Sequence, residues 1–85
     1  MRAEEFMQLL RVRPFVPLRL HMTDGQTYDI RHPDLVIVLQ SRAVIGIAPN
    51  PTTGVVERTE HLSLFHIVRV EELQTSGTPH NGPAS

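Results

Sequence analysis

Histidine is the first side chain to consider for chemistry, since it binds metals and carries protons near neutral pH. His61 and His66 are five residues apart, which fits neither the i, i+4 spacing of a helical ligand pair nor the i, i+2 spacing of a strand pair. His21 shares a strand face with Arg19, and His32 precedes a proline that shapes a bend. The chain has no cysteine, which excludes thiolate ligands and disulfides. We therefore predict no metal site and no cofactor.

Nucleophilic catalysis requires a hydroxyl or thiol within reach of a base. Ser41 and Ser63 both fall in predicted tight turns, where serine commonly bonds to the backbone. No glycine-rich phosphate loop is present, because the glycines at positions 25, 46 and 54 stand alone. We predict that the protein is not an enzyme, and we identify no small-molecule substrate for it.

Arginine offers the best candidate for an anion-binding surface. All cationic side chains are arginines, and the net charge of −1 does not suit a non-specific nucleic-acid binder. The candidates for binding RNA phosphate come from the predicted helix end and first two strands, namely Arg11, Arg13, Arg19 and Arg31. Asp29 neutralises this face, and no aromatic side chain stands beside the arginines to stack on bases. Nucleic acid is therefore a less favoured partner than protein.

The length of 85 residues predicts a single domain with a modest core and no spacious cleft. We place this domain at residues 1–74. Residues 75–85 contain almost no apolar side chains, so we predict a disordered tail there. No apolar run approaches the length of a signal peptide or of a membrane-spanning helix, which predicts a cytoplasmic protein without a membrane partner.

Residues 3–11 are predicted to form a short amphipathic helix, because Phe6, Leu9 and Leu10 recur at helical spacing. Pro14 ends it, since the residue before a proline is disfavoured in helical conformation. Two to three helical turns are not stable alone, so we expect the apolar stripe to pack against the rest of the chain.

A hairpin is predicted around Thr23-Asp24-Gly25, between strands at residues 15–23 and 26–31. A three-residue loop with Gly25 in the left-handed region places apolar residues opposite one another. Leu20 then faces Tyr28, and Arg19 faces Asp29 on the other side of the sheet as an opposite-charge pair. A two-residue turn would instead mix charged and apolar side chains on each face.

Two unbroken apolar runs follow, at residues 35–39 and 43–48, and are predicted to lie at the centre of the sheet. The first continues the second strand after a bend or break at His32-Pro33. Gly46 within the second run indicates a bulge, a sharp bend or the close approach of another backbone. Residues 49–54 are a loop.

The remaining strands are predicted at residues 55–62 and 67–70, joined by one helical turn at residues 63–65. We expect them to lie at sheet edges and to pair with another copy or a protein partner. The residues of this candidate edge-strand interface are Val56, Arg58, Glu60, Ile67 and Arg69. The alternative is a monomer whose edge is protected by its charges, and the sequence leaves both open.

These elements predict a mainly β (α+β) fold, with a short N-terminal helix followed by a five-stranded antiparallel barrel. The order resembles the Sm-like fold, within the broader class of SH3-like barrels. RNA-binding Sm-like proteins carry an Asp and an Asn after the second strand, whereas this chain has His32-Pro33-Asp34-Leu35. Residues 61–66 do not match the family's later Arg-Gly motif either. The resemblance therefore implies a topology and transfers no RNA-binding residue.

The run from Arg13 to Arg19, together with Asp24-Gly25 and His32-Pro33, also resembles a group of short bacterial proteins with no established activity. We predict a non-catalytic binding or assembly module that acts through edge-strand or barrel-surface contacts with protein. The alternative is an Sm-like RNA-binding regulator that uses the arginine face. Salt dependence separates the two, since phosphate binding weakens steeply with ionic strength.

Overall fold

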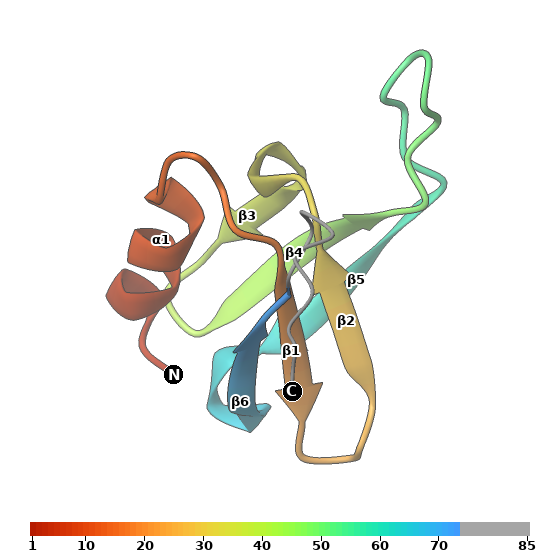
Figure 1. Ribbon diagram of the computed structural model, residues 1–85. Helices are drawn as coiled ribbons and strands as arrows, with labels where there is room; N and C mark the ends of the chain where they lie inside the picture. Colours follow the sequence, from red (N-terminus) through yellow and green to blue (C-terminus); the bar gives the residue numbers. More distant parts are fainter. Residues whose placement is uncertain (74–85) are drawn as a thin grey trace, which may run out of the picture.

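The computed structural model describes residues 1–73, which form one helix and six strands. Figure 1 shows their arrangement. The predicted disordered tail at residues 75–85 lies outside this range. In chain order the elements are α1 (Ala3–Arg11), β1 (Leu18–Met22), β2 (Thr27–Ile30), the 3-10 turn η1 (Pro33–Leu35), β3 (Val36–Val38), β4 (Arg42–Ile47), β5 (Arg58–Ser63), the 3-10 turn η2 (Leu64–His66) and β6 (Ile67–Glu72).

The fold is mainly β with an N-terminal helix, as the sequence predicts, but within residues 1–73 the strands do not close into a five-stranded barrel. They form two antiparallel three-stranded sheets with the orders β2-β1-β6 and β3-β4-β5, called here sheet A and sheet B. The predicted bent strand is divided by η1, where Pro33 contributes no backbone N–H. Its two halves therefore become β2 in sheet A and β3 in sheet B.

The hairpin of β1 and β2 has the predicted register. Its turn is closed by the amide of Met22, which donates to the carbonyl of Gln26 at 2.9 Å. Gly25 has a φ of +87°, a conformation that side chains with a Cβ disfavour, so the three-residue loop is confirmed. The facing residues are Leu18–Ile30, Arg19–Asp29, Leu20–Tyr28 and His21–Thr27.

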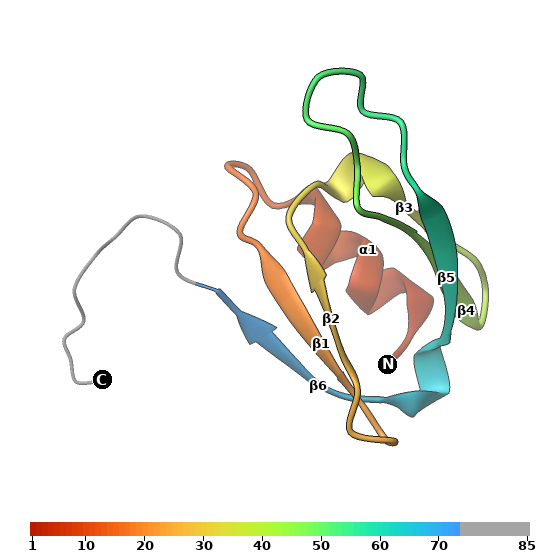
Figure 2. The same ribbon diagram turned by 90° about the vertical axis from the view of Figure 1, so that its right-hand side faces the viewer.

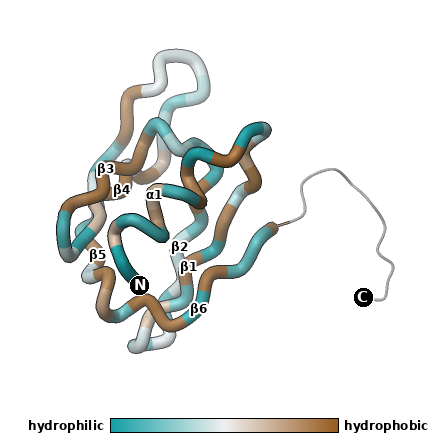
Figure 3. Tube along the Cα trace, turned by 90° about the vertical axis from the view of Figure 1, so that its left-hand side faces the viewer, coloured by the Kyte–Doolittle hydropathy of each residue, from teal (hydrophilic) through white to brown (hydrophobic). Residues whose placement is uncertain are grey.

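The apolar stripe of α1 packs between the two sheets, as expected for a helix too short to be stable alone. Phe6 is fully buried and Leu10 nearly so. Figure 3 shows α1 lying over one of the two openings between sheet A and sheet B. The core that it completes consists of Phe6, Leu10, Leu18, Leu20, Met22, Ile30, Ala43, Ile45, Leu62, Leu64 and Ile67.

The prediction that both apolar runs lie at the centre of a sheet is correct for β4 and wrong for β3. β3 is a three-residue edge strand of sheet B. Its middle residue, Ile37, is 63% exposed because it faces the outside of the sheet. The hydrophobic sequence of this segment does not indicate that only one face of β3 is covered by other residues.

Strand β6 is an edge strand with an irregular register. Arg69 lies opposite His21 and Ile67 lies opposite Met22, so Val68 has no partner residue on β1. Such a one-residue bulge disturbs the regular ladder and increases the local twist of the strand. The free edge of β6 is therefore a poor template for a further strand.

Candidate binding surface on the open side of the two sheets

The second opening between the sheets is hollow. It lies on the side opposite α1, between β2 on one sheet and β4 and β5 on the other (Figure 2). The hollow has a volume of about 460 Å³. This hollow was not predicted from the sequence, because its walls come from segments far apart in the chain.

The floor of the hollow is apolar. It contains Ile30 of β2 and Ile45 of β4, both almost fully buried, and Leu35, Val36 and Ile47 around them. Tyr28 forms part of one wall, and its hydroxyl donates to Oε1 of Gln26 at 2.8 Å. The hollow therefore presents an aromatic surface beside aliphatic groups.

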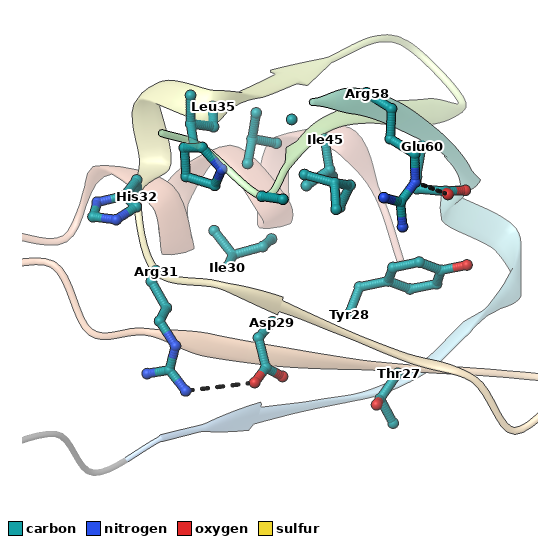
Figure 4. A pocket seen from close by; sticks show the side chains of 15 residues that line it. Thr27, Tyr28, Asp29, Ile30, Arg31, His32, Leu35, Ile45, Arg58 and Glu60 are labelled. Carbon is teal, nitrogen blue, oxygen red and sulfur yellow. Dashed lines mark hydrogen bonds and ion pairs between the residues drawn. The ribbon is translucent and has the colours of Figure 1, made fainter. Parts of the chain in front are cut away.

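The opposite wall carries two charged side chains, Arg58 and Glu60, which also line the hollow. Arg58 faces Ile47 and Glu60 faces Ile45, so both lie on the inner face of sheet B with the buried Leu62. The Nε of Arg58 lies 3.3 Å from Oε2 of Glu60. Figure 4 shows the guanidinium of Arg58 and the ring of Tyr28 facing each other across the hollow.

One pattern in the sequence could have predicted this wall, namely the alternate positions of Arg58, Glu60 and Leu62 along one strand. Because strand side chains alternate between faces, a buried Leu62 places the other two on the inner face as well. Arg58 and Glu60 were predicted to be edge-interface residues because their strand was expected to lie at a sheet edge. The structure instead places their side chains at the open side of the core.

The other residues of the candidate edge interface are dispersed. Val56 precedes β5 and covers Gly46, where a Cβ would lie 2.7 Å from its Cγ1. Ile67 is buried in the core, at 7% exposure, while Arg69 is exposed on the outer face of sheet A. Strands β5 and β6 do lie at sheet edges, as predicted. Their pairing with another copy stays a prediction.

Two of the four candidate RNA-binding arginines meet on the outer face of sheet A, where they share one carboxylate. Arg19 donates to both oxygens of Asp29, from Nε at 2.7 Å and from Nη2 at 3.0 Å. Nη2 of Arg31 lies 3.5 Å from Oδ2 of Asp29. The hydrogen bond from Arg19 lowers the pKa of Asp29, against the opposing effect of burial, and the nearby positive charges lower that pKa further.

His21 lies beside this group, between two charged side chains of β6, the acidic Glu71 and the cationic Arg69. Its Nε2 is 3.0 Å from Oε1 of Glu71 and also 3.0 Å from Nη2 of Arg69. The hydrogen bond with His21 is the main cause that lowers the pKa of Glu71. The outer face of sheet A is therefore a network of paired charges.

The other two arginines belong to the end of α1. Nη1 of Arg13 donates to the carbonyl of Leu10 in the last helical turn at 2.7 Å and to that of the cap residue Val12 at 2.9 Å. Arg11 is exposed in the last helical turn. Within residues 1–73, no ion pair or hydrogen bond joins Arg11 or Arg13 to the pair on sheet A.

The part of the chain that the structure describes contains no group of three or more metal-ligating side chains placed to hold an ion. No helix in this part is long and apolar enough to cross a membrane.

Comparisons with known proteins do not assign the chain to a family. No family model matches the sequence, no curated protein is similar to it at a significant level, and no solved structure matches the fold. The function must therefore be argued from the surface geometry itself.

Proposed function

We propose that the protein is a non-catalytic binding or assembly module that holds a protein partner at the hollow between β2 and β5. One observation carries this proposal: on the side that α1 does not cover, a hollow lined by the partly buried apolar side chains of Leu35, Val36 and Ile47 stays open to solvent. A concave apolar surface with a few polar groups at its rim is the usual form of a binding site.

The composition of the hollow supports a protein partner. Aliphatic side chains and the ring of Tyr28 supply apolar area, which contributes most of the free energy of association in protein interfaces. Arg58 and Glu60 supply polar contacts at the rim. Tyrosine and arginine are also enriched among the residues that dominate binding energy.

The relation to the Sm-like and SH3-like barrels is part of this proposal. This relation is supported by the element order: an N-terminal helix, a hairpin, a strand that breaks at Pro33 and a single 3-10 turn before the last strand. In this interpretation the molecule is an opened form of such a barrel.

RNA binding on the arginine face is less well supported. The carboxylate of Asp29 already receives Arg19 and Arg31, and Glu71 contacts His21 and Arg69. These carboxylates neutralise much of the positive charge of this face, which weakens its attraction for the successive phosphates of an RNA strand.

The proposal is tested by selecting peptides from a random display library on the immobilised protein and mapping the selected peptides by amide chemical-shift changes. We expect shifts to cluster on β2, β4 and β5 around the hollow. Tyr28→Ala should weaken binding, whereas Ile37→Ala, which removes an exposed side chain outside the hollow, should not. Failure to enrich any peptide, or shifts confined to another face, would contradict the proposal.

A parallel titration with single-stranded RNA at increasing salt tests the alternative. Phosphate binding predicts a steep decrease of affinity with salt and loss of binding in Arg19→Ala and Arg31→Ala. RNA binding of this kind without peptide binding would favour the regulator.

A further inference from the structure

The free edge of β2 carries backbone groups that point away from β1. In an antiparallel pair, facing residues alternate between hydrogen-bonded and non-hydrogen-bonded positions. Because Met22 donates to Gln26, the next hydrogen-bonded pairs along the ladder are Leu20–Tyr28 and Leu18–Ile30. The N–H and C=O groups of Thr27 and Asp29 therefore point outward, and no strand formed by residues 1–73 lies beside β2 on that side in sheet A.

This free edge borders the hollow. Tyr28 and Ile30 alternate with Thr27 and Asp29 along β2, and Figure 4 shows Ile30 on the side facing Ile45. A strand added to β2 would continue the same alternation, since neighbouring strands of a sheet share a common pleat. Its side chains opposite Tyr28 and Ile30 would enter the hollow, and those opposite Asp29 and Arg31 would lie on the outer face of sheet A.

The charges at the rim indicate what such a strand should carry. The Arg31 side chain is 55% exposed, against 31% for its partner Asp29. Across the hollow, Arg58 pairs with both Glu60 and the more exposed Glu57, so its charge is already matched at that rim. At the β2 rim, by contrast, the cation is more accessible than the anion that pairs with it. An acidic side chain in the partner is therefore better matched than a basic one.

We propose that β2 binds an extended peptide segment that adds to sheet A as an antiparallel strand, with an acidic residue opposite Arg31 and apolar residues opposite Ile30 and Tyr28. This inference rests on the proposed function and specifies its partner. Main-chain hydrogen bonds to Thr27 and Asp29 hold the segment, and the hollow selects its alternate side chains. The edge of β6 is less suited, because its bulge interrupts the ladder at Val68.

The probe is a fluorescent hexapeptide with the sequence Thr-Glu-Val-Thr-Ile-Thr, measured by anisotropy with the full chain. Its Glu lies opposite Arg31, its Val opposite Ile30, its central Thr opposite Asp29 and its Ile opposite Tyr28. We expect saturable binding, with at least about tenfold weaker binding for the reversed sequence and for the peptide with Lys in place of Glu.

Backbone pairing is tested by N-methylation of the probe, which leaves the protein unchanged. Methylation of the central Thr removes a donor that faces Asp29 and should abolish binding. Methylation of Val removes a donor that points away from β2 and should have little effect. Equal loss at both positions would overturn the strand-addition geometry.

The acidic position is tested by exchange of charges. Arg31→Glu should bind the Lys peptide better than the Glu peptide and so reverse the preference of the native protein. Arg42→Glu is the matched control, since Arg42 is exposed on β4 outside the hollow and should leave the preference unchanged. An unchanged preference in Arg31→Glu would overturn the placement of the acidic residue.

The two proposals fail in different ways. If library peptides bind at the hollow but the N-methyl and charge-exchange tests give the wrong pattern, the binding module stands and strand addition to β2 is wrong. If peptides pair with the free edge of β5 instead, chemical shifts will move at Thr59 and His61 and stay unchanged at Thr27 and Asp29. If no peptide binds anywhere, both proposals fail.

Discussion

The two openings between the sheets are built in opposite ways. α1 covers one of them and inserts Phe6 and Leu10 among the strands, so that this side is sealed by aliphatic and aromatic contacts. On the other side the residues of the described chain leave an apolar hollow, and the inner face of β5 bears Arg58 and Glu60 in place of aliphatic residues.

The side covered by α1 contributes buried apolar contacts, whereas the open side keeps charged residues at the end of the core. Leu62 and Arg58 lie on the same face of the same strand, yet only Leu62 is buried. Burying an arginine or a glutamate without full pairing is costly, so these residues mark where the core ends. The open side is therefore where contacts outside the molecule can be made at little cost to the fold.

The largest effect is expected from truncating the sealed side. Phe6→Ala should lower the free energy of unfolding by about 3–5 kcal/mol, because it leaves a cavity where a fully buried ring was. Tyr28→Ala on the open side should lower it by only about 1 kcal/mol, since that ring is half-buried. Urea denaturation measures both. Similar losses in the two variants would show that the two sides are not distinct.

An intermediate effect is expected at Gly46. Gly46→Ala should destabilise the protein by about 1–3 kcal/mol, because its Cβ would overlap Cγ1 of Val56 at 2.7 Å. The double variant with Val56→Ala should recover most of this loss, whereas Gly46→Ala with Val55→Ala should not. Thermal and urea denaturation measure the recovery. No recovery would mean that Val56 does not lie over β4.

The smallest effect is expected at Asp29, which lies at the rim of the open side. Its pKa is lowered in the folded state by the hydrogen bond from Arg19, so the ionised form stabilises the fold. This contribution is present above the ordinary aspartate pKa of about 4 and disappears as the pH falls through the lower folded-state value.

The native protein should therefore lose its advantage over Asp29→Asn as the pH is lowered from 6 toward 2, in denaturation curves measured at each pH. Asp34→Asn, at an exposed carboxylate with no ion pair among residues 1–73, is the control. A difference between native protein and Asp29→Asn that grows at low pH would contradict the role of the Arg19 pair.

The local parts of the fold could be predicted from the sequence, because short-range patterns determine them. Alternating apolar residues and Gly25 fix the register of the β1-β2 hairpin, and the spacing of Phe6 and Leu10 fixes the buried face of α1. At Gly46 the sequence indicated a bulge, a sharp bend or a nearby backbone, whereas the neighbour that approaches it most closely is the side chain of Val56.

The parts that depend on distant segments could not be predicted. The run around Ile37 has the same composition as a buried strand, and only the position of β3 at an edge exposes it. The number of strands was wrong because an interruption at Pro33 can bend a strand or divide it between two sheets. The hollow depends on the relative placement of β2 and β5, which no local pattern encodes.

The bulge at Val68 has a consequence for polymerisation. A fibre made by stacking strands requires each molecule to offer two complementary free edges, one at either end of its sheet. Sheet A offers a regular edge at β2 but a distorted one at β6. Growth through sheet A should therefore stop after a single added strand. The molecule would bind one extended segment and would not polymerise through this sheet.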